Sequence, residues 1–134
     1  MHLRLVVMIA AAHLYASATA APSATVSASP DVARLATHTP APEYPPDALQ
    51  HHISGHGVFL LRVDIASGRV TQVIVGLSTG ASVLDAAAIR AFREWRFRPG
   101  AVPYHKITSV HMSPPQGSGE MLVKVPTTFT LAKT

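Results

Sequence analysis

Hydrophobic and polar positions alternate along two neighbouring segments in the middle of the chain. Residues 57–65 read GVFLLRVDI and place large apolar side chains on one face at a period of two, namely Phe59, Leu61, Val63 and Ile65. Residues 70–77 read VTQVIVGL and repeat this alternation. The segment between them is short and contains Gly68, which suits a tight turn. The pattern therefore predicts an antiparallel β-hairpin.

A helical period follows the hairpin. From Leu84 the chain reads LDAAAIRAFREW, in which Leu84, Ala88 and Phe92 recur on one face and basic or acidic residues occupy the other. Ser82 stands three residues before Asp85, which is the spacing of a capping box at the start of a helix. Pro99-Gly100 would end the helical segment. We expect one amphipathic helix that lies across a sheet.

The end of this helix carries the only tryptophan of the chain, in the run Trp95-Arg96-Phe97-Arg98-Pro99. Trp95 is the last apolar position of the helical pattern, and Phe97 lies two residues further, where an extended chain would face the same side. Large aromatic side chains are mostly core material. The run predicts a hydrophobic clamp where the helix leaves the sheet; the alternative is an exposed binding surface.

Near the C-terminus, residues 121–131 read MLVKVPTTFTL and alternate again, which predicts a third strand. Pro126 has no N–H to give to a ladder, so it favours an edge strand or a bulge. A free strand edge is a place where another peptide can pair. The expected fold is α+β: a small three-stranded antiparallel sheet, made of the hairpin and the returning strand, with one amphipathic helix packed across it.

The first twenty residues have the form of a secretory signal peptide. Arg4 precedes an apolar run, and Ala18-Thr19-Ala20 provides a small-residue cleavage site. An uncleaved membrane anchor is the alternative, although such an anchor needs about 20 apolar residues. Residues 21–42 are rich in Ala, Ser, Thr and Pro without a period, so we expect a flexible lead. The folded domain is expected over residues 43–134, opening with Tyr44-Pro45-Pro46 and a short helix.

Composition narrows the functional classes. The chain has 134 residues, of which 48% are hydrophobic and 13% charged, as for one globular domain. It contains no cysteine, which excludes disulfides and thiolate chemistry. The net charge of +4 is spread along the chain, so no nucleic-acid partner is expected. His51, His52 and His56 lack neighbouring carboxylates at ligand spacing. We therefore expect no metal site, cofactor or enzyme activity, since no nucleophile–base pairing is evident either.

An ordered set of short motifs identifies a family. The motifs occur over residues 42–131 in this order: Glu43-Tyr44-Pro45, Ile53-Ser54-Gly55, Gly68-Arg69-Val70, Ser78-Thr79-Gly80, Leu84-Asp85-Ala86-Ala87-Ala88-Ile89, Trp95-Arg96-Phe97-Arg98-Pro99 and Val125-Pro126-Thr127-Thr128-Phe129. Together they closely resemble the C-terminal domain of the TonB energy-transducer family. That resemblance implies the same small α+β fold that the periodicity predicts.

The resemblance also implies a function. TonB proteins of Gram-negative bacteria are anchored in the inner membrane, and their periplasmic domain grasps a short peptide segment of outer-membrane receptors. They pass on energy from a proton-driven motor. The grasp resembles strand addition beside the third strand. It implies partner-binding positions at Tyr44, Pro45, Val123, Lys124, Val125, Thr127 and Phe129, and mainly structural motif positions at Gly55, Gly68, Leu84, Asp85, Trp95, Arg96, Phe97 and Pro99.

The chain departs from the family pattern in three places. Ile9 stands where the family's anchor has a serine one turn before a histidine, here His13. The long Pro-Lys and Pro-Glu spacer is absent, and residues 104–120 resemble an insertion before the third strand. Coupling to an inner-membrane motor is therefore expected only if the N-terminus is retained. The alternative is a stand-alone periplasmic interaction or structural module, which could pair with a second copy through its edge strand.

Overall fold

The computed structural model describes residues 21–100, 110–111 and 119–132. In chain order its elements are β1 (Ser23–Val26), α1 (Pro30–Leu35), β2 (Ala36–His38), α2 (Pro46–Gln50), β3 (Gly55–Asp64), β4 (Val70–Leu77), α3 (Ser82–Arg93), β5 (Arg96–Phe97), β6 (Val110–His111) and β7 (Glu120–Thr130). Within the described ranges no helix is both long and apolar enough to cross a membrane. The expected signal peptide, residues 1–20, lies outside them.

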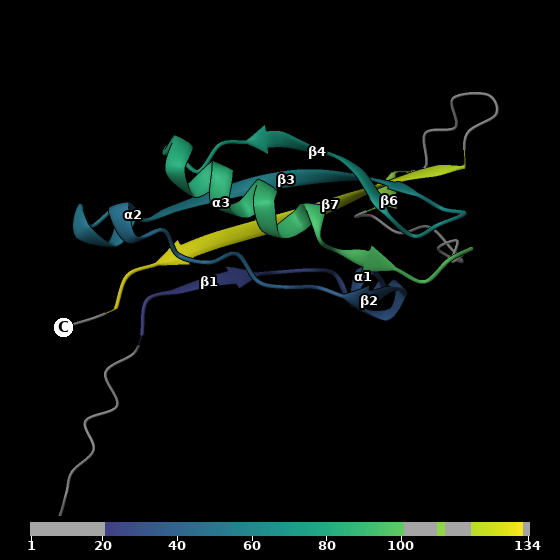
Figure 1. Ribbon diagram of the computed structural model, residues 1–134, viewed down its shortest axis with the longest axis horizontal. Helices are drawn as coiled ribbons and strands as arrows, with labels where there is room; N and C mark the ends of the chain where they lie inside the picture. Colours follow the sequence, from purple (N-terminus) through teal and green to yellow (C-terminus); the bar gives the residue numbers. More distant parts are fainter. Residues whose placement is uncertain (1–20, 101–109, 112–118, 133–134) are drawn as a thin grey trace, which may run out of the picture.

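The main sheet is antiparallel, with strand order β1-β7-β3-β4 and β6 paired beside β1 on the same side of β7 (Figure 1). Strands β3 and β7 pair along the whole of β3, from Gly55 opposite Phe129 to Asp64 opposite Glu120. The sequence-predicted hairpin, helix and returning strand are confirmed as β3–β4, α3 and β7. The α+β class is confirmed too, but the expected three strands are joined by β1 and β6.

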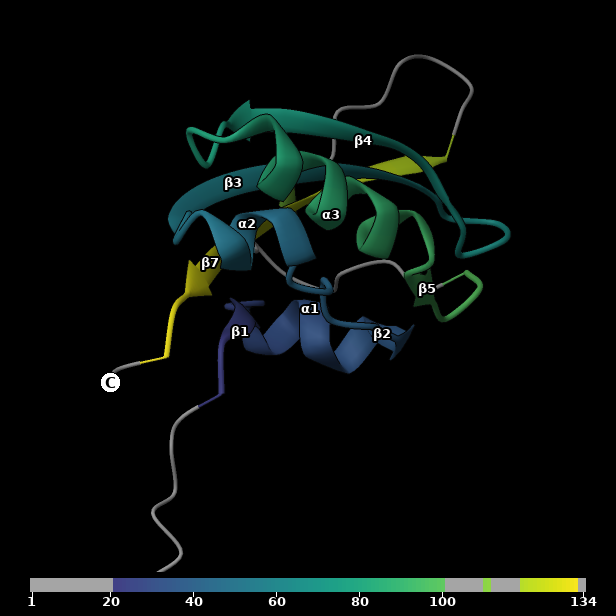
Figure 2. The same ribbon diagram turned by 60° about the vertical axis from the view of Figure 1, so that its left-hand side comes forward.

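One face of this sheet is covered by α3 (Figure 2). Alternation along β3 and β7 sends every second side chain toward the helix, which is why the core lies between the two layers. Helix α3 contributes its apolar stripe to that space. The largest fully buried side chains are Trp95, Phe59, Phe92, Phe97, Phe129, Leu61, Leu84 and Met121.

The structure contradicts the expectation that the lead, residues 21–42, has little structure of its own. The lead forms β1, α1 and β2, and these elements lie beside the rest of the domain (Figure 2). Ser29 caps α1 by accepting a hydrogen bond from the Val32 N–H at 3.3 Å, and the Val32 side chain is buried in the core. Strand β2 pairs with β5 as a separate two-stranded sheet. The composition of residues 21–42 could not predict these elements, because each is only a few residues long and the strands pair with residues far away in sequence.

The expectation that the third strand is a sheet edge is also wrong. Strand β7 lies inside the sheet: β3 pairs with one side, and β1 and β6 pair with the other. Pro126 is tolerated because it stands just beyond the last β1 pair, Val26 opposite Thr127, where Ser27 N–H donates to its carbonyl oxygen at 3.0 Å. Of the expected insertion at 104–120, the structure describes only 110–111 and 119–120.

The start of α3 differs from the predicted capping box. The helix begins at Ser82 itself, and the residue before it, Ala81, makes no side-chain cap. The Asp85 carboxylate turns instead to the preceding loop, where it accepts hydrogen bonds from Ser78 and Thr79. An acidic side chain in the first turn still suits the positive end of the helix dipole.

A candidate peptide-binding edge

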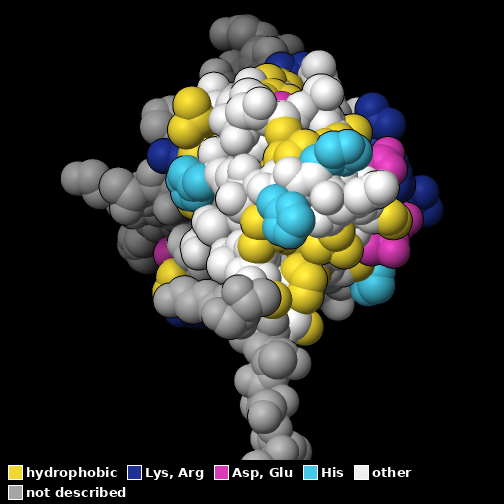
Figure 3. Space-filling model, turned by 90° about the vertical axis from the view of Figure 1, so that its left-hand side faces the viewer, with side chains coloured by type: hydrophobic (Ala, Val, Ile, Leu, Met, Phe, Trp, Pro, Cys, Tyr) yellow, Lys and Arg dark blue, Asp and Glu magenta, His cyan; other side chains and the backbone are white. Residues whose placement is uncertain are grey.

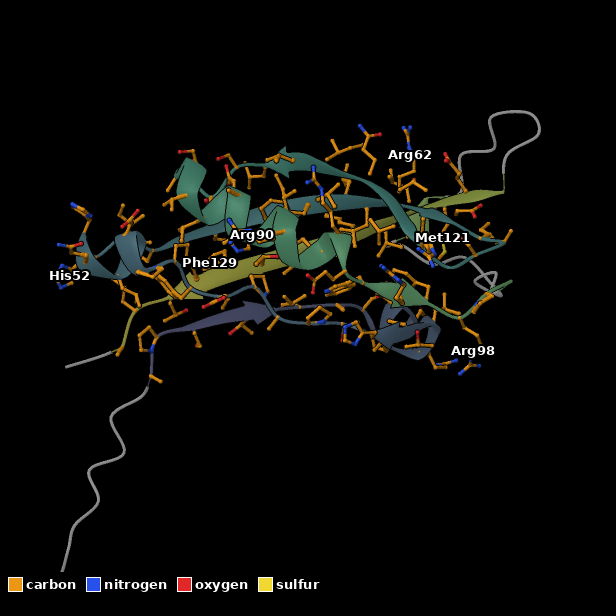
Figure 4. The ribbon with its side chains drawn as sticks, viewed as in Figure 1. His52, Arg62, Arg90, Arg98, Met121 and Phe129 are labelled. Atoms are coloured by element: carbon orange, nitrogen blue, oxygen red, sulfur yellow. The ribbon has the colours of Figure 1, made fainter. Side chains whose placement is uncertain are left out.

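Five of the seven expected partner-binding residues lie on β7. Val123, Val125, Thr127 and Phe129 are buried on the face that α3 covers, whereas Lys124 is exposed on the opposite face. Figure 4 shows the direction of the strand, with Phe129 beside α2 and Met121 at the other end. The four buried side chains serve the core, so any partner at the edge of β7 would meet main-chain groups rather than these side chains.

Tyr44 and Pro45, the other two expected residues, lie just before α2. The Tyr44 hydroxyl donates a hydrogen bond to the carbonyl oxygen of Ile53, and its ring meets Phe129 edge to face, with centroids 5.5 Å apart. Burial raises the pKa of the Tyr44 hydroxyl. Pro45 occupies the position before the first turn of α2. The structure thus brings Tyr44 and Phe129 together, as a tie between α2 and the end of β7.

The side of β7 that faces away from β3 is called the outer edge here. Strand β1 pairs with it from Ser23 opposite Thr130 to Val26 opposite Thr127, and β6 pairs with it at Leu122 and Val123. Because Ser27 donates to Pro126, and hydrogen-bonded pairs alternate in antiparallel strands, Thr128 and Thr130 also direct their main-chain groups to β1. The outer edge is therefore a strand-accepting surface, and the chain's own lead occupies part of it.

A pocket of about 390 Å³ lies behind β1. Its wall consists largely of small side chains of the lead together with core residues, including Ala24, Ala28, Ala33, Ala36, Val32 and Trp95. Side chains of this size leave space that a well-packed interior would fill. The small side chains of β1 therefore fill this pocket only in part.

The motif residues after α3 form the predicted hydrophobic clamp. Trp95 and Phe97 are each 2% exposed, which excludes the alternative of an exposed binding surface for these two side chains. Aromatic contacts run from Phe59 through Phe92 and Trp95 to Phe97. The Trp95 indole N–H donates to the Pro40 carbonyl at 3.0 Å, so the clamp also fastens the lead.

At two glycines of the motif set, another backbone segment lies so close that a side chain would not fit. Gly68 has a φ of +72°, and a Cβ there would lie 2.0 Å from the Phe97 carbonyl oxygen. At Gly55 a Cβ would meet the Thr79 carbonyl oxygen at 2.5 Å. Arg96 donates through Nη1 to the carbonyl oxygens of Arg93 and Trp95, whereas Pro99 is exposed. Apart from Pro99, these positions hold the framework together.

The Asp85 carboxylate accepts three hydrogen bonds from the loop before α3. Its Oδ1 accepts from the Thr79 N–H at 2.9 Å and the Thr79 hydroxyl at 2.7 Å, and its Oδ2 accepts from the Ser78 hydroxyl. Partial burial acts to raise the pKa of Asp85, but these hydrogen bonds outweigh it and lower the pKa below its usual value. The loop before α3 is thereby fixed to the helix.

Histidines gather at the end of the molecule that carries α2, without forming a ligand set. Figure 3 faces that end and shows their side chains separated on the surface. His51 Nδ1 lies 2.9 Å from the Asp47 carbonyl oxygen, and His56 Nδ1 lies 3.0 Å from the Thr128 hydroxyl. In the part of the chain that the structure describes, no three His, Asp or Glu side chains converge as metal ligands would.

Sequence reasoning missed the segment Ser23–Ser27, which lies on the outer edge. Its only signal was a short alternation: Ala24 and Val26 are partly buried, whereas Ser23 and Thr25 are exposed. Four residues of small side chains are too weak a pattern to predict a strand without knowing its partner.

Comparison with known proteins confirms the resemblance. The family model described as "Gram-negative bacterial TonB protein C-terminal" matches residues 40–131, more than half of the chain. Protein tonB2 of Pseudomonas aeruginosa is 44% identical over 63 residues, which cover 46% of this chain and 23% of that protein. Protein TonB of Xanthomonas campestris pv. campestris is 39% identical over 61 residues, covering 46% and 27%.

A solved structure agrees on the fold. The solution NMR structure of the Pseudomonas aeruginosa TonB CTD aligns with a TM-score of 0.54 at 22% identity, over 74% of this chain and 87% of that one. At this identity the likeness concerns the fold alone. The matched region corresponds to about a quarter of the length of the curated relatives.

Proposed function

The chain belongs to the TonB C-terminal domain family, and from this membership we propose that it is a periplasmic peptide-binding module of receptor-coupled transport. Its partner is a short extended segment of an outer-membrane receptor. It performs no catalysis and needs no cofactor. Coupling to a proton-driven motor in the inner membrane requires that the N-terminal residues 1–20 stay attached as an anchor.

The observation that carries this proposal is the pairing of β1 with β7. A four-residue extended segment far away in sequence lies antiparallel on the outer edge, in register from Ser23–Thr130 to Val26–Thr127. An edge that accepts one extended segment through main-chain hydrogen bonds has the geometry to accept another. Main-chain pairing makes few demands on the side chains of the ligand, which suits an adaptor for several receptors.

The test is a titration of isotope-labelled protein with peptides from N-terminal segments of outer-membrane receptors encoded in the same genome. We expect chemical-shift changes on β7 from Leu122 to Thr130 and around Tyr44, the ring that packs on Phe129. The matched control is the same peptide N-methylated on alternate residues. Methylation of the amides that face β7 should abolish binding, whereas methylation of those facing away should not. If no peptide perturbs β7 at millimolar concentration, the receptor role is wrong.

The alternative function is a stand-alone periplasmic module without motor coupling. It is favoured by the closure of the outer edge by the chain's own β1 and β6. N-terminal sequencing of the exported protein separates the two: cleavage after Ala20 excludes anchoring by residues 1–20. Sedimentation tests the related possibility of a homodimer. A dimer formed through β7 should have a concentration-dependent mass that Thr128→Pro removes, because that substitution eliminates an outer-edge donor.

A further inference from the structure

We propose that residues 23–27 are an internal ligand of the outer edge of β7, which an incoming partner strand must displace. The inference rests on the proposed function for the identity of the partner, but not for the existence of the internal ligand. It also defines the class of peptide that fits: an extended, uncharged segment with an apolar side chain larger than alanine at the position that Ala24 now occupies.

The main chain of residues 23–27 pairs with β7 through alternate residues only. Ser23, Thr25 and Ser27 stand in hydrogen-bonded pairs with Thr130, Thr128 and Pro126, and the intervening residues turn their amides away from β7. Pairing ends at Pro126, which lacks the N–H that would return a bond to Ser27. The lead therefore holds the edge through a short, interrupted ladder, as a replaceable ligand would.

Strand β1 can leave while α1 stays in place. Val32 of α1 is 1% exposed and belongs to the core, and Ser29, which lies outside β1, caps α1. Both residues follow β1 in the chain, so the release of β1 unwinds neither α1 nor its cap.

A pocket of about 390 Å³ lies behind β1. Ala24 and Val26 face inward from β1, and Ala28 follows them in the pocket wall. Ala24 and Trp95 both line this pocket, and the methyl group at position 24 fills little of it. A partner strand with a leucine-sized side chain there would bury more apolar surface than the lead does. The incoming strand would thus have an advantage that the internal ligand lacks.

Neither of the two paired segments carries a charged side chain. They read SATVS and PTTFT and contain no titratable residue. A titratable group does lie beside them, since His56 Nδ1 of β3 is 3.0 Å from the Thr128 hydroxyl. Exchange at this edge should therefore respond little to salt, and the competition depends mainly on pairing and apolar fit. If the lead occupies the edge about nine-tenths of the time, it weakens the apparent affinity of a partner about tenfold.

The first experiment changes how firmly the lead is held. Thr25→Pro removes an amide that faces β7, whereas Thr25→Ala changes the same exposed position, keeps the amide and serves as the matched control. The probes are a synthetic peptide of residues 22–28, the same peptide with leucine in place of Ala24, and the receptor peptides described above. We expect Thr25→Pro to bind all of them about tenfold more tightly than the parent, and Thr25→Ala to match the parent.

The second experiment locks the lead in place. The chain has no cysteine, and Thr25 and Thr128 form a pair whose Cα separation of about 5.5 Å suits a disulfide. Thr25→Cys with Thr128→Cys should bind the leucine-containing peptide when reduced and at least about tenfold more weakly when oxidised. Each single-cysteine variant, separated from any dimer linked by an intermolecular disulfide, should bind the peptide equally well with oxidant and with reductant.

The outcomes separate this inference from the receptor role. If receptor peptides bind the parent, Thr25→Pro and the oxidised double variant equally, the receptor role survives and the internal ligand is wrong. If the lead peptide binds Thr25→Pro but no receptor peptide binds any variant, the internal ligand is supported and the receptor role is wrong. If no peptide binds even to a Thr25→Pro variant with a native-like spectrum, both are overturned.

Discussion

Trp95 joins three parts of the chain that are far apart in sequence. Its ring packs against Phe92 of α3 and Phe97 of β5, and its indole N–H donates to the Pro40 carbonyl in the lead. Trp95→Ala should lower the free energy of unfolding by about 3–5 kcal/mol, because it leaves a large cavity and an unpaired carbonyl. Thermal melts would show this against Val75→Ala, whose side chain is 39% exposed. A melt unchanged from the parent would contradict the clamp.

Asp85 links stability to pH. Its pKa is lowered despite partial burial, because Ser78 and Thr79 donate hydrogen bonds to the carboxylate. A lowered folded-state pKa means that the stabilisation is present above the unfolded-state pKa and is lost as pH falls through the folded-state value. Asp85→Asn should therefore melt lower than the parent at pH 7, and the two should converge in acid. If the two melting temperatures stay equally far apart down to acid pH, the Asp85 carboxylate is not the source of the difference.

His52 adopts a backbone conformation that favours glycine. It follows α2 with a φ of 53°, and the Ile53 N–H reaches back to the Ala48 carbonyl at 2.8 Å, as in a Schellman motif. His52→Gly should raise the free energy of unfolding by about 1 kcal/mol, since a side chain is costly in this region. Denaturant titration would measure it. Gln50→Gly, inside α2, should instead destabilise; a loss of stability in both variants would contradict the argument.

At the scale of elements, what could be predicted depended on length and period. The hairpin, α3 and β7 each carry enough alternating or helical positions to be recognised without their neighbours. Strands β1, β2 and β6 are four residues or shorter and exist through partners distant in sequence. The capping box failed for a related reason, because Asp85 found better donors in a loop that the spacing rule ignores.

The same limit explains the outcome for the candidate site. Alternation correctly placed Val123, Val125 and Phe129 on one strand, but it could not tell which main-chain edge of that strand is occupied. The missing N–H of Pro126 favours an edge strand or a bulge, whereas in the structure Pro126 marks the end of the pairing with β1. The role of the seven partner-binding positions stays a prediction.

At Gly68, the turn of the β3–β4 hairpin lies directly against Phe97, which follows α3. The Phe97 N–H donates to the Gly68 carbonyl at 2.8 Å, and no side chain fits at Gly68. Gly68→Ala should destabilise by at least about 2 kcal/mol, from an unfavourable positive φ and displacement of Phe97. Gly80→Ala is the matched control, because its φ is +90° with nothing within 4 Å of the added Cβ. Equal losses in urea titrations would show that the contact with Phe97 carries no energy.

At the scale of the whole molecule, the lead and the body of the domain should differ in stability. Strand β7 is paired with β3 along its length on one side and with the short β1 on the other. Its amides alternate between these two neighbours. A small unit held by few buried contacts opens more often than the core does. The β7 amides that face β1 should therefore become exposed when the lead opens, whereas those that face β3 should become exposed only when the core opens.

Hydrogen exchange followed by NMR measures this difference directly. The amides of Thr128 and Thr130 face β1, whereas those of Thr127 and Phe129 face β3. The first pair should exchange at least about tenfold faster than the second, although all four residues are adjacent in one strand. Thr25→Pro should accelerate Thr128 further and leave Phe129 unchanged, because only the contact with the lead is weakened. Equal protection of both pairs would mean that β1 opens only with the whole domain, and a partner could then reach the outer edge only through global unfolding.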